Sequence, residues 1–296
     1  MGDGFEIIQP SHAPLLKGVF AQAGKQMWCC FPPFLCAFSL PPNRVVKIGE
    51  QNGCVCLIVQ RPDGVDMLCP PMPFSTSVLM SLVTKLEDSN AGRKTRILWV
   101  DEQDAAHMAG LPFVLQKKDA EYLYNPKLIA ESRGKPFRDV RKQVHKFESI
   151  AQFRKLTVQD IPACEDLLLY WRKRQGRKHP FLLDWGYTRA ALVQFPHWQP
   201  PDLYGWCVEH HGQFVAFAMA GEILPDVAQF FIAKTNPDVP GLSFFLRFCV
   251  YRELVHYRLI NDASDLGLPG LQQFKKKFRP AGQLQVYSAE YCREAW

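Results

Sequence analysis

Apolar and polar positions alternate along the first half of the chain in patterns that predict strands and helices. Two alternating runs flank Asn52-Gly53, the dipeptide most typical of a tight β-hairpin turn. Farther along, apolar residues recur on one face of a segment that begins at Ser75, as expected for an amphipathic helix with a good N-cap. This order of elements predicts an α/β layer with a partly antiparallel sheet. The predicted elements are strands at 45–48, 54–59, 65–68 and 96–100 and helices at 75–87 and 101–108.

The pattern begins again near residue 150. A short strand leads to Thr157, after which Asp160 is a possible helix cap and Pro162 suits the first helical turn. His210 and His211 fall in a turn, and no third metal-ligating residue lies at a useful spacing, so we assign them no metal. The predicted elements are strands at 153–156, 204–209, 214–220, 227–233 and 259–260 and helices after 157, at 242–256 and after 270.

Length and composition agree with two folded domains. The chain has 296 residues, and 47% of them are hydrophobic, which excludes a disordered or fibrous protein. We expect an N-terminal domain over 1–132, a basic connecting helix over 133–150 and a C-terminal domain over 151–296. The fold class is α/β (α+β), and each domain has a mixed, mostly antiparallel sheet flanked by helices.

Cysteines and apolar runs indicate a cytoplasmic protein. The ten cysteines lie mostly inside apolar runs and form no Cys-x-x-Cys pair, so we expect reduced, buried thiols and no metal site. The first residues lack the basic head and apolar run of a signal peptide. The apolar stretch at 27–40 is shorter than the about 20 residues that span a bilayer, and Pro32-Pro33 interrupts it. We therefore expect it to lie in the core of the first domain, with no transmembrane segment.

The net charge of +6 becomes informative through the position of the basic residues. In the predicted helix at 133–148, Val140 and Val144 share a face, and basic side chains gather on the opposite face. Such a face attracts a phosphate backbone or another polyanion, although charged helix faces are often only solvated. Similar clusters recur at 171–179 and 275–279. The basic residues of the helix face are Arg138, Arg141, Lys142, His145 and Lys146.

The segment from Arg258 to Pro280 combines a short strand, a polar crossover and an amphipathic helix. Ligands of open α/β sheets bind beyond the carboxyl ends of strands, where Asn261, Asp262 and Asp265 are expected. The alternative is that Asp265 accepts hydrogen bonds from the backbone at the start of the helix, with the lysines at 275–277 on a solvated face.

This segment resembles the closing motif of a bacterial family related to the soluble C-terminal part of phosphatidylglycerol lysyltransferases. The residues on the motif are Asn261, Asp265, Leu266, Gly267, Gly270, Leu271, Lys275, Phe278 and Pro280, with Gln272 in place of an arginine. Two further motifs are similar to the family at Gly134, Lys135, Arg141 and Phe147 and at Ile232, Lys234, Asn236 and Gly241, with Ala233 in place of a glutamate. The strand and helix around Thr157 resemble the opening of an acetyltransferase-type (GNAT) domain.

The resemblance implies two tandem GNAT-like domains and transfer of an aminoacyl group from a charged tRNA to an amine or hydroxyl acceptor. Aminoacyl-tRNA would be the co-substrate, and a soluble small-molecule acceptor is expected because the sequence predicts no membrane helix. For tRNA binding we select Arg138, Arg141, Lys142, Arg172 and Lys275. Asp265 is the candidate base or ammonium anchor, and Lys234, Asn261 and Tyr251 are candidates to face the oxyanion.

The loop at 236–241 argues against coenzyme A as a cofactor. It contains two prolines, which lack N–H donors, and an aspartate, which repels phosphate. Two other functions remain open. The first is a noncatalytic tandem GNAT-like module that binds RNA or another polyanion. The second is an acyl-CoA N-acyltransferase, which would bind coenzyme A at this loop.

Overall fold

The computed structural model describes residues 4–175 and 185–292. It divides the chain into two compact units, Met1–Glu121 with Leu284–Trp296, and Tyr122–Gln283. The first boundary therefore precedes the predicted one at residue 132, because the segment after Glu121 pairs with strands of the second unit. The last strand returns to the first unit, which the predicted domain at 151–296 did not include. Of the basic cluster at 171–179, the part from 176 onward lies outside the described residues.

Unit 1 is a mixed seven-stranded sheet with helices, in the strand order β1-β2-β3-β4-β5-β14-β6 over the described residues. Only β4 and β5 run parallel among its paired strands. Its strands are β1 (Phe5–Ile7), β2 (Val45–Gln51), β3 (Cys54–Arg61), β4 (Gly64–Met67), β5 (Arg96–Asp101), β6 (Phe113–Lys117) and β14 (Val286–Tyr291). Its helices are η1 (Pro10–His12), α1 (Ala13–Gln22), η2 (Trp28–Cys30), α2 (Pro32–Phe38), α3 (Thr76–Asn90) and α4 (Glu102–His107).

Local sequence signals explain these elements. Asn52 and Gly53 adopt φ angles of 50° and 75°, the left-handed turn that joins β2 and β3 as predicted. Ser75 caps α3 by accepting a hydrogen bond from the Val78 amide at 3.4 Å. The apolar face of α3 is buried against the sheet, and the stretch at 27–40 is buried in this unit, as expected.

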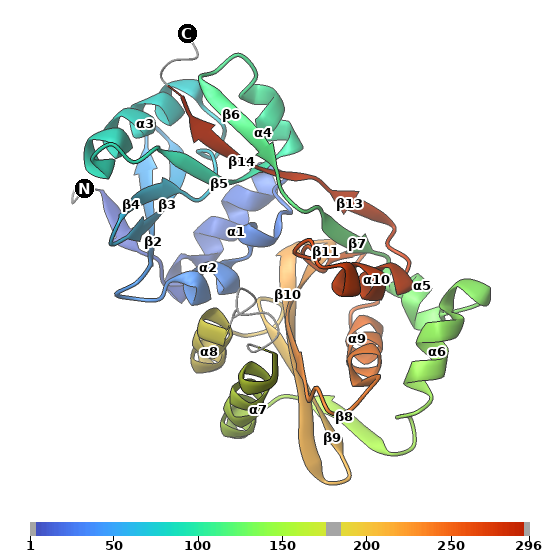
Figure 1. Cartoon of the computed structure of the whole chain (residues 1–296). Coiled ribbons are helices and arrows are strands. Elements are labelled where there is room, and N and C mark those ends of the chain that lie inside the picture. The colour runs from blue at the N-terminus through green and yellow to red at the C-terminus, as the bar shows by residue number, and fades with distance from the viewer. Residues whose placement is uncertain (1–3, 176–184, 293–296) are drawn as a thin grey trace. The chain divides into compact units, whose positions relative to one another are not determined.

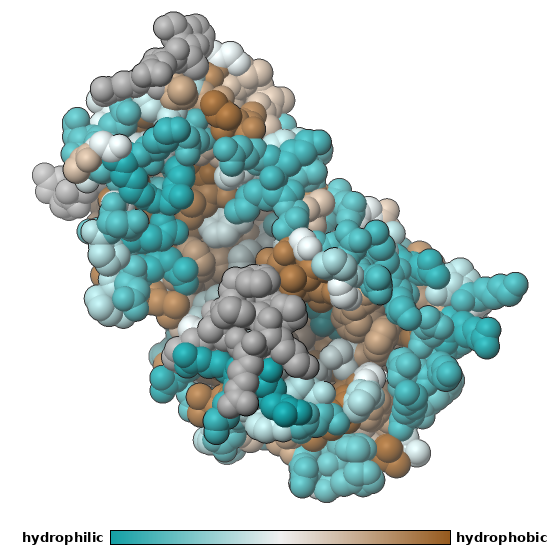
Figure 2. Space-filling model, in the orientation of Figure 1, coloured by the Kyte–Doolittle hydropathy of each residue, from teal (hydrophilic) through white to brown (hydrophobic). Residues whose placement is uncertain are grey.

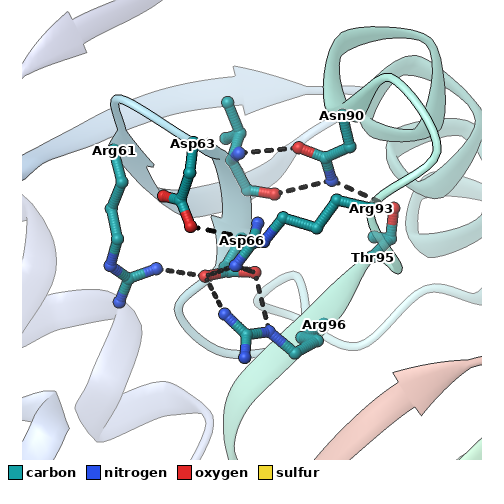
Figure 3. A network of polar contacts seen from close by, with 8 residues as sticks. Arg61, Asp63, Asp66, Asn90, Arg93, Thr95 and Arg96 are labelled. Atoms are coloured by element: carbon teal, nitrogen blue, oxygen red, sulfur yellow. Dashed lines mark hydrogen bonds and ion pairs between the residues drawn. The ribbon is translucent and has the colours of Figure 1, made fainter.

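A fully buried carboxylate ties the hairpin β3–β4 to α3 and β5 (Figure 3). Asp66 accepts hydrogen bonds from Arg93 at 2.9 and 3.0 Å and from Arg96 at 3.2 and 3.1 Å, and Arg61 forms a further ion pair. Burial alone would raise the pKa of Asp66, but the hydrogen bonds from Arg96 and Arg93 outweigh it and lower that pKa. Asn90 completes this network through hydrogen bonds with the Val65 backbone.

Unit 2 is also built on a mixed seven-stranded sheet over the described residues, in the order β13-β7-β12-β11-β10-β9-β8. Figure 1 shows α7 and α8 on one face of this sheet and α9 and α6 on the other. Its strands are β7 (Glu121–Tyr124), β8 (Ala151–Lys155), β9 (Tyr204–His210), β10 (Gln213–Leu224), β11 (Val227–Thr235), β12 (Leu259–Asn261) and β13 (Gly282–Leu284). Its helices are α5 (Pro126–Glu131), η3 (Lys135–Phe137), α6 (Arg138–Val144), η4 (Val158–Asp160), α7 (Ile161–Gln175), α8 (Trp185–Gln194), η6 (Phe195–His197), α9 (Leu242–Glu253) and α10 (Pro269–Lys277).

The basic helix predicted at 133–148 is shorter than expected. Gly134 has a φ of 75°, and Pro136 follows in a 3₁₀ turn, so the α-helix begins only at Arg138. Val140 and Val144 are buried as predicted, and together with Phe147 they join α9 and the sheet in the apolar core of this unit. In the described residues, no helix has both the length and the apolar character needed to cross a membrane.

We expect Asp66→Asn to lower the free energy of unfolding of unit 1 by about 3 kcal/mol, because removing one partner of a buried ion network leaves the other charges uncompensated. Asp63→Asn is the matched control, since Asp63 has a side chain that is 70% exposed and lies 3.8 Å from Arg93. Calorimetry gives the stabilities, and hydrogen exchange of the β3 and β4 amides assigns the loss to this unit. Equal stability of the two variants would contradict a structural role for the network.

Candidate functional site

The parallel strands β11 and β12 separate after three residue pairs, and we call this point the strand fork. The last pair is Gln229 with Asn261. Strand β11 continues to Thr235, whereas the chain after Asn261 turns into a loop at 262–268. The fork therefore lies at the carboxyl end of a parallel strand, the place predicted from the sequence.

On the α9 face, the loop is anchored by what we call the buried-ion cluster: Asp262, Arg247, Tyr251 and Lys275. The Arg247 guanidinium donates two hydrogen bonds of 3.0 Å to the Asp262 carboxylate, and the Tyr251 hydroxyl donates a third at 2.8 Å. The Lys275 amino group lies 3.5 Å from Asp262 Oδ1 and donates to the carbonyls of Asp262 and Ala263. These contacts compensate a carboxylate that is 3% exposed.

The surroundings of the cluster shift the pKa values of its acid and its lysine. Burial acts to raise the pKa of Asp262, but the charges of Arg247 and Lys275 prevail and lower it. Burial lowers the pKa of Lys275 to about 8, against the opposing effect of the Asp262 charge. The Arg247 guanidinium also lies over the rings of Phe230 and Phe274, at 4.6 and 5.2 Å from their centroids. The cluster is therefore a satisfied structural network.

Asp265 fixes the other end of the loop. Its carboxylate accepts a 2.6 Å hydrogen bond from the Tyr122 hydroxyl and a 3.0 Å bond from the Gly267 amide. Ala263 and Leu266 adopt φ angles of 51° and 56°, which L-residues with a Cβ rarely take. Asp265 is only 6% exposed, and the N-cap of α10 is Leu268. These contacts give Asp265 a definite role in holding the loop.

Polar side chains gather on the opposite face of the fork, beneath α7 and α8. Gln229 and Asn261 are fully buried and lie side by side in register, so their side chains leave the sheet on the same face. Ala228 and Phe230 belong to the core on the α9 face, which places Gln229 on the α7 face. Lys234 lies on this face too, with its amino group 4.0 Å from the centroid of the Trp171 ring.

The structure divides the predicted catalytic residues between the two faces. Tyr251 and Asp265 belong to the α9 side and the loop, whereas Lys234 and Asn261 belong to the α7 side. Tyr251 is fully buried and donates its hydroxyl to Asp262, which corrects the expectation that it faces an oxyanion.

Two of the predicted tRNA-binding residues have structural contacts instead. Lys275 is 3% exposed within the buried-ion cluster, so the expectation that it lies on a basic surface is corrected. Arg141 donates to the carbonyls of Ser132 and Gly134 at the end of α5. Arg172 lies half-buried on α7, apart from the basic residues of α6.

A basic surface does form where α6 and α10 meet. Lys277 bonds to Asp139 of α6 at 2.8 Å, and the Arg279 guanidinium donates to the Pro136 carbonyl at 3.0 Å. The hydrogen bond from Lys277 lowers the pKa of Asp139. Figure 2 shows hydrophilic side chains gathered over α5 and α6. We define the basic surface by its exposed residues, Arg138, Lys142, Lys276, Lys277 and Arg279.

Sequence reasoning missed Arg247, Tyr122 and Gln229. The signal for Arg247 was present, because an arginine inside the apolar run of α9 needs a buried acid. Tyr122 is distant in sequence from Asp265, and nothing local links the two.

Among the described residues, no group of three or more His, Cys, Asp or Glu side chains is arranged to hold a metal ion.

We expect wild-type protein to gain stability relative to a Lys275→Met variant as the pH rises from 8 to 10. The folded pKa of Lys275 is about 8, whereas an unfolded lysine titrates near 10.4, so in this window the unfolded chain binds the extra proton and stability rises with pH. The difference should be on the order of 2 kcal/mol, measured by urea unfolding at several pH values. Lys276→Met, at the exposed neighbouring position, is the control and should follow the wild type. Parallel curves for wild type and Lys275→Met would contradict a lowered pKa for the buried Lys275 amino group.

Solved structures share this two-sheet arrangement. A conserved protein of unknown function from Bacteroides thetaiotaomicron has a TM-score of 0.81 at 19% identity, and the match covers 97% of this chain and 99% of that one. The L-PGS structure from Bacillus licheniformis has a TM-score of 0.64 at 13% identity, with 100% and 95% covered. A tandem GNAT protein from the clavulanic acid biosynthesis pathway has a TM-score of 0.54 at 11% identity, with 97% and 98% covered. The fold is thus the tandem GNAT architecture predicted from the sequence.

The sequence comparisons agree with the structural ones. No curated protein matches the chain. The family model described as phosphatidylglycerol lysyltransferase, C-terminal, matches residues 38–290. Since this match spans most of the chain and includes the strand fork and its loop, the protein belongs to the phosphatidylglycerol lysyltransferase C-terminal domain family.

Proposed function

We propose that this protein transfers an aminoacyl group from aminoacyl-tRNA to a soluble amine or hydroxyl acceptor. The observation that carries the proposal is the polar face of the strand fork. Gln229 and Asn261 are buried there side by side, and Lys234 lies on the same face of β11, five positions farther along and beside Trp171. A buried polar face at the carboxyl end of a parallel strand is a site for a reacting group, since polar side chains in a core need a compensating role. Family membership supports transferase chemistry there.

The proposed step is attack of the acceptor on the ester carbonyl of the aminoacyl-tRNA. A bond forms between the acceptor nitrogen or oxygen and the carbonyl carbon, the ester C–O bond breaks, and the acceptor proton passes to the released ribose oxygen. Negative charge develops on the carbonyl oxygen in the transition state. Lys234 and Asn261 are the donors that would stabilise it, because buried donors act strongly where water is excluded.

The loop before α9 supports an aminoacyl donor over an acyl-CoA donor. Asn236 accepts a hydrogen bond from the Asp238 amide at 2.9 Å, which closes a turn there. The Leu242 amide, at the start of α9, donates to the Val239 carbonyl at 3.3 Å. Asp238 adds a carboxylate that interacts with Tyr170 and Arg174. A pyrophosphate would meet an occupied amide and a negative charge at this helix start.

The basic surface is the proposed contact for the tRNA backbone. Its exposed cations on α6 and α10 are held in one area by the contacts of Lys277 and Arg279 with α6. Phosphate contacts of this kind give affinity without reading sequence.

A noncatalytic RNA-binding module is the second candidate function. It is favoured by Ala233, which stands in place of the family's glutamate, and by Asp265, whose carboxylate is bonded to Tyr122. Such a module would retain tRNA without turning it over. Protection of the protein from heat by acetyl-CoA would instead support an acyl-CoA N-acyltransferase.

Lys234→Met should lower kcat for transfer from radiolabelled aminoacyl-tRNA by roughly 10²–10³, the usual loss when one oxyanion donor is removed. Lys155→Met, at an exposed position on β8, is the charge-matched control and should retain activity. Asp265→Asn is the comparison variant. If Asp265 only holds the loop, this substitution lowers the stability of the protein and leaves the pH profile of kcat unchanged. Loss of turnover in Asp265→Asn with an intact fold would instead make this carboxylate the base. Retained activity in Lys234→Met would remove the proposed role of the polar face.

Arg138→Gln combined with Lys142→Gln should weaken tRNA binding and reduce the slope of log K against log salt by about 1 for each lost phosphate contact. Fluorescence anisotropy with labelled tRNA at several salt concentrations measures both effects. Lys85→Gln combined with Lys155→Gln makes the same change in net charge at exposed positions elsewhere and controls for nonspecific attraction. If both double variants alter the slope equally, the basic surface is not a specific contact.

A further inference from the structure

Among the described side chains that β11 and β12 place on the polar face, Gln229 has an unfilled hydrogen-bonding position. It is fully buried, and its Oε1 atom has no hydrogen-bond partner. Its Nε2 atom donates to the Phe230 carbonyl at 3.3 Å. Rotating the amide by 180° would place Oε1 against that carbonyl oxygen, so the contact fixes which end of the amide is open.

An open acceptor in a core is costly. A buried acceptor without a donor costs about 1–3 kcal/mol, and an apolar side chain of similar shape would avoid that cost. The neighbours Ala228 and Phe230 point to the other face of the sheet and are apolar, so neither side chain donates to Oε1. A group that donates to Oε1 in the working state of the protein would account for the glutamine.

The register of the strands indicates which group this is. Gln229 lies directly across from Asn261, on a neighbouring strand whose backbone is about 4.8 Å away. In the proposed reaction, Asn261 and Lys234 face the carbonyl oxygen of the aminoacyl group. The α-amino group is attached to the carbon next to that carbonyl, so two adjacent side chains on neighbouring strands can contact both groups at once.

We infer that Gln229 is a specificity-determining residue that accepts a hydrogen bond from the α-amino group of the aminoacyl donor. This inference rests on the proposed function and assigns recognition of the donor's α-amino group to Gln229. A neutral amide suits this task, because it accepts from an amine without adding a buried negative charge. Donors that lack the amine leave Oε1 unfilled and bind less well.

The test compares aminoacyl donors with matched donors that lack the α-amino group. Binding is measured with 3′-amide-linked RNA minihelices carrying each proteinogenic amino acid or its desamino analogue, and turnover with the corresponding charged tRNAs. For the preferred amino acid, wild-type protein should favour the amine-bearing form by about 10- to 100-fold, the range expected for one unpaired buried acceptor. Gln229→Leu should reduce that ratio to near 1 and raise the melting temperature, since it removes an unfilled acceptor.

Trp206→Phe is the matched control. Trp206 also has a buried polar atom without a partner, its Nε1, but it belongs to the core on the α9 face of the sheet. This variant should keep the wild-type preference for the amine. Gln229→Met, which conserves volume, serves as the second variant if Gln229→Leu does not fold.

Each result decides between the two claims. A wild-type preference that survives in Gln229→Leu or Gln229→Met overturns the inference and leaves the transferase proposal intact. Discrimination in binding that is lost in these variants, without turnover by wild-type protein, supports the inference and overturns the transferase proposal. No discrimination by wild-type protein in either assay overturns the inference.

Discussion

Burial of the Asp262 carboxylate is the constraint on which the rest of unit 2 depends. A charge with 3% exposure is stable only if its neighbours replace the water it has lost. Arg247 and Tyr251 do this from α9, and Lys275 does it from α10. One acid thus connects the end of β12 to two helices. The positions of the loop at 262–268 and of the strand fork follow from these contacts.

Unit 1 meets the same constraint with different residues. Its parallel strands β4 and β5 also separate early, and β5 ends at Asp101, whose carboxylate is 2.8 Å from the Lys25 amino group. Lys25 also pairs with Asp104 at 2.7 Å. Burial raises the pKa of Asp104, and the Asp101 charge adds to this effect. In both units, therefore, a buried acid matched by a cation closes the carboxyl end of the parallel pair, but unit 1 has two acids for one cation.

The sequence predicted local elements well because their signals are local. The Asn52-Gly53 turn and the Ser75 cap depend on neighbouring residues only, and both are confirmed. The tandem fold came from motif resemblance. The return of β14 to unit 1 was not predicted, because strand pairing across the whole chain leaves no mark in a short window. Lys275 was misjudged for a related reason: a lysine in a basic run is expected to be exposed, and only its distant partner Asp262 makes its burial possible.

The division of the fork into two faces limits where chemistry can occur. In the buried-ion cluster on the α9 face, each charged group has a partner of opposite charge or a carbonyl acceptor, so removing a proton from Tyr251 or Lys275 for catalysis would break the contacts that hold the loop. On the α7 face, Asn261 Oδ1 accepts a 2.9 Å hydrogen bond from the Ala263 amide, whereas Gln229 is a neutral amide that can bind a substrate group without leaving a buried ion unpaired. A rigid ionic side therefore allows the other side to keep an unfilled acceptor at Gln229. The stability cost of that acceptor is tolerable because the buried-ion cluster has already fixed the strands on which it lies.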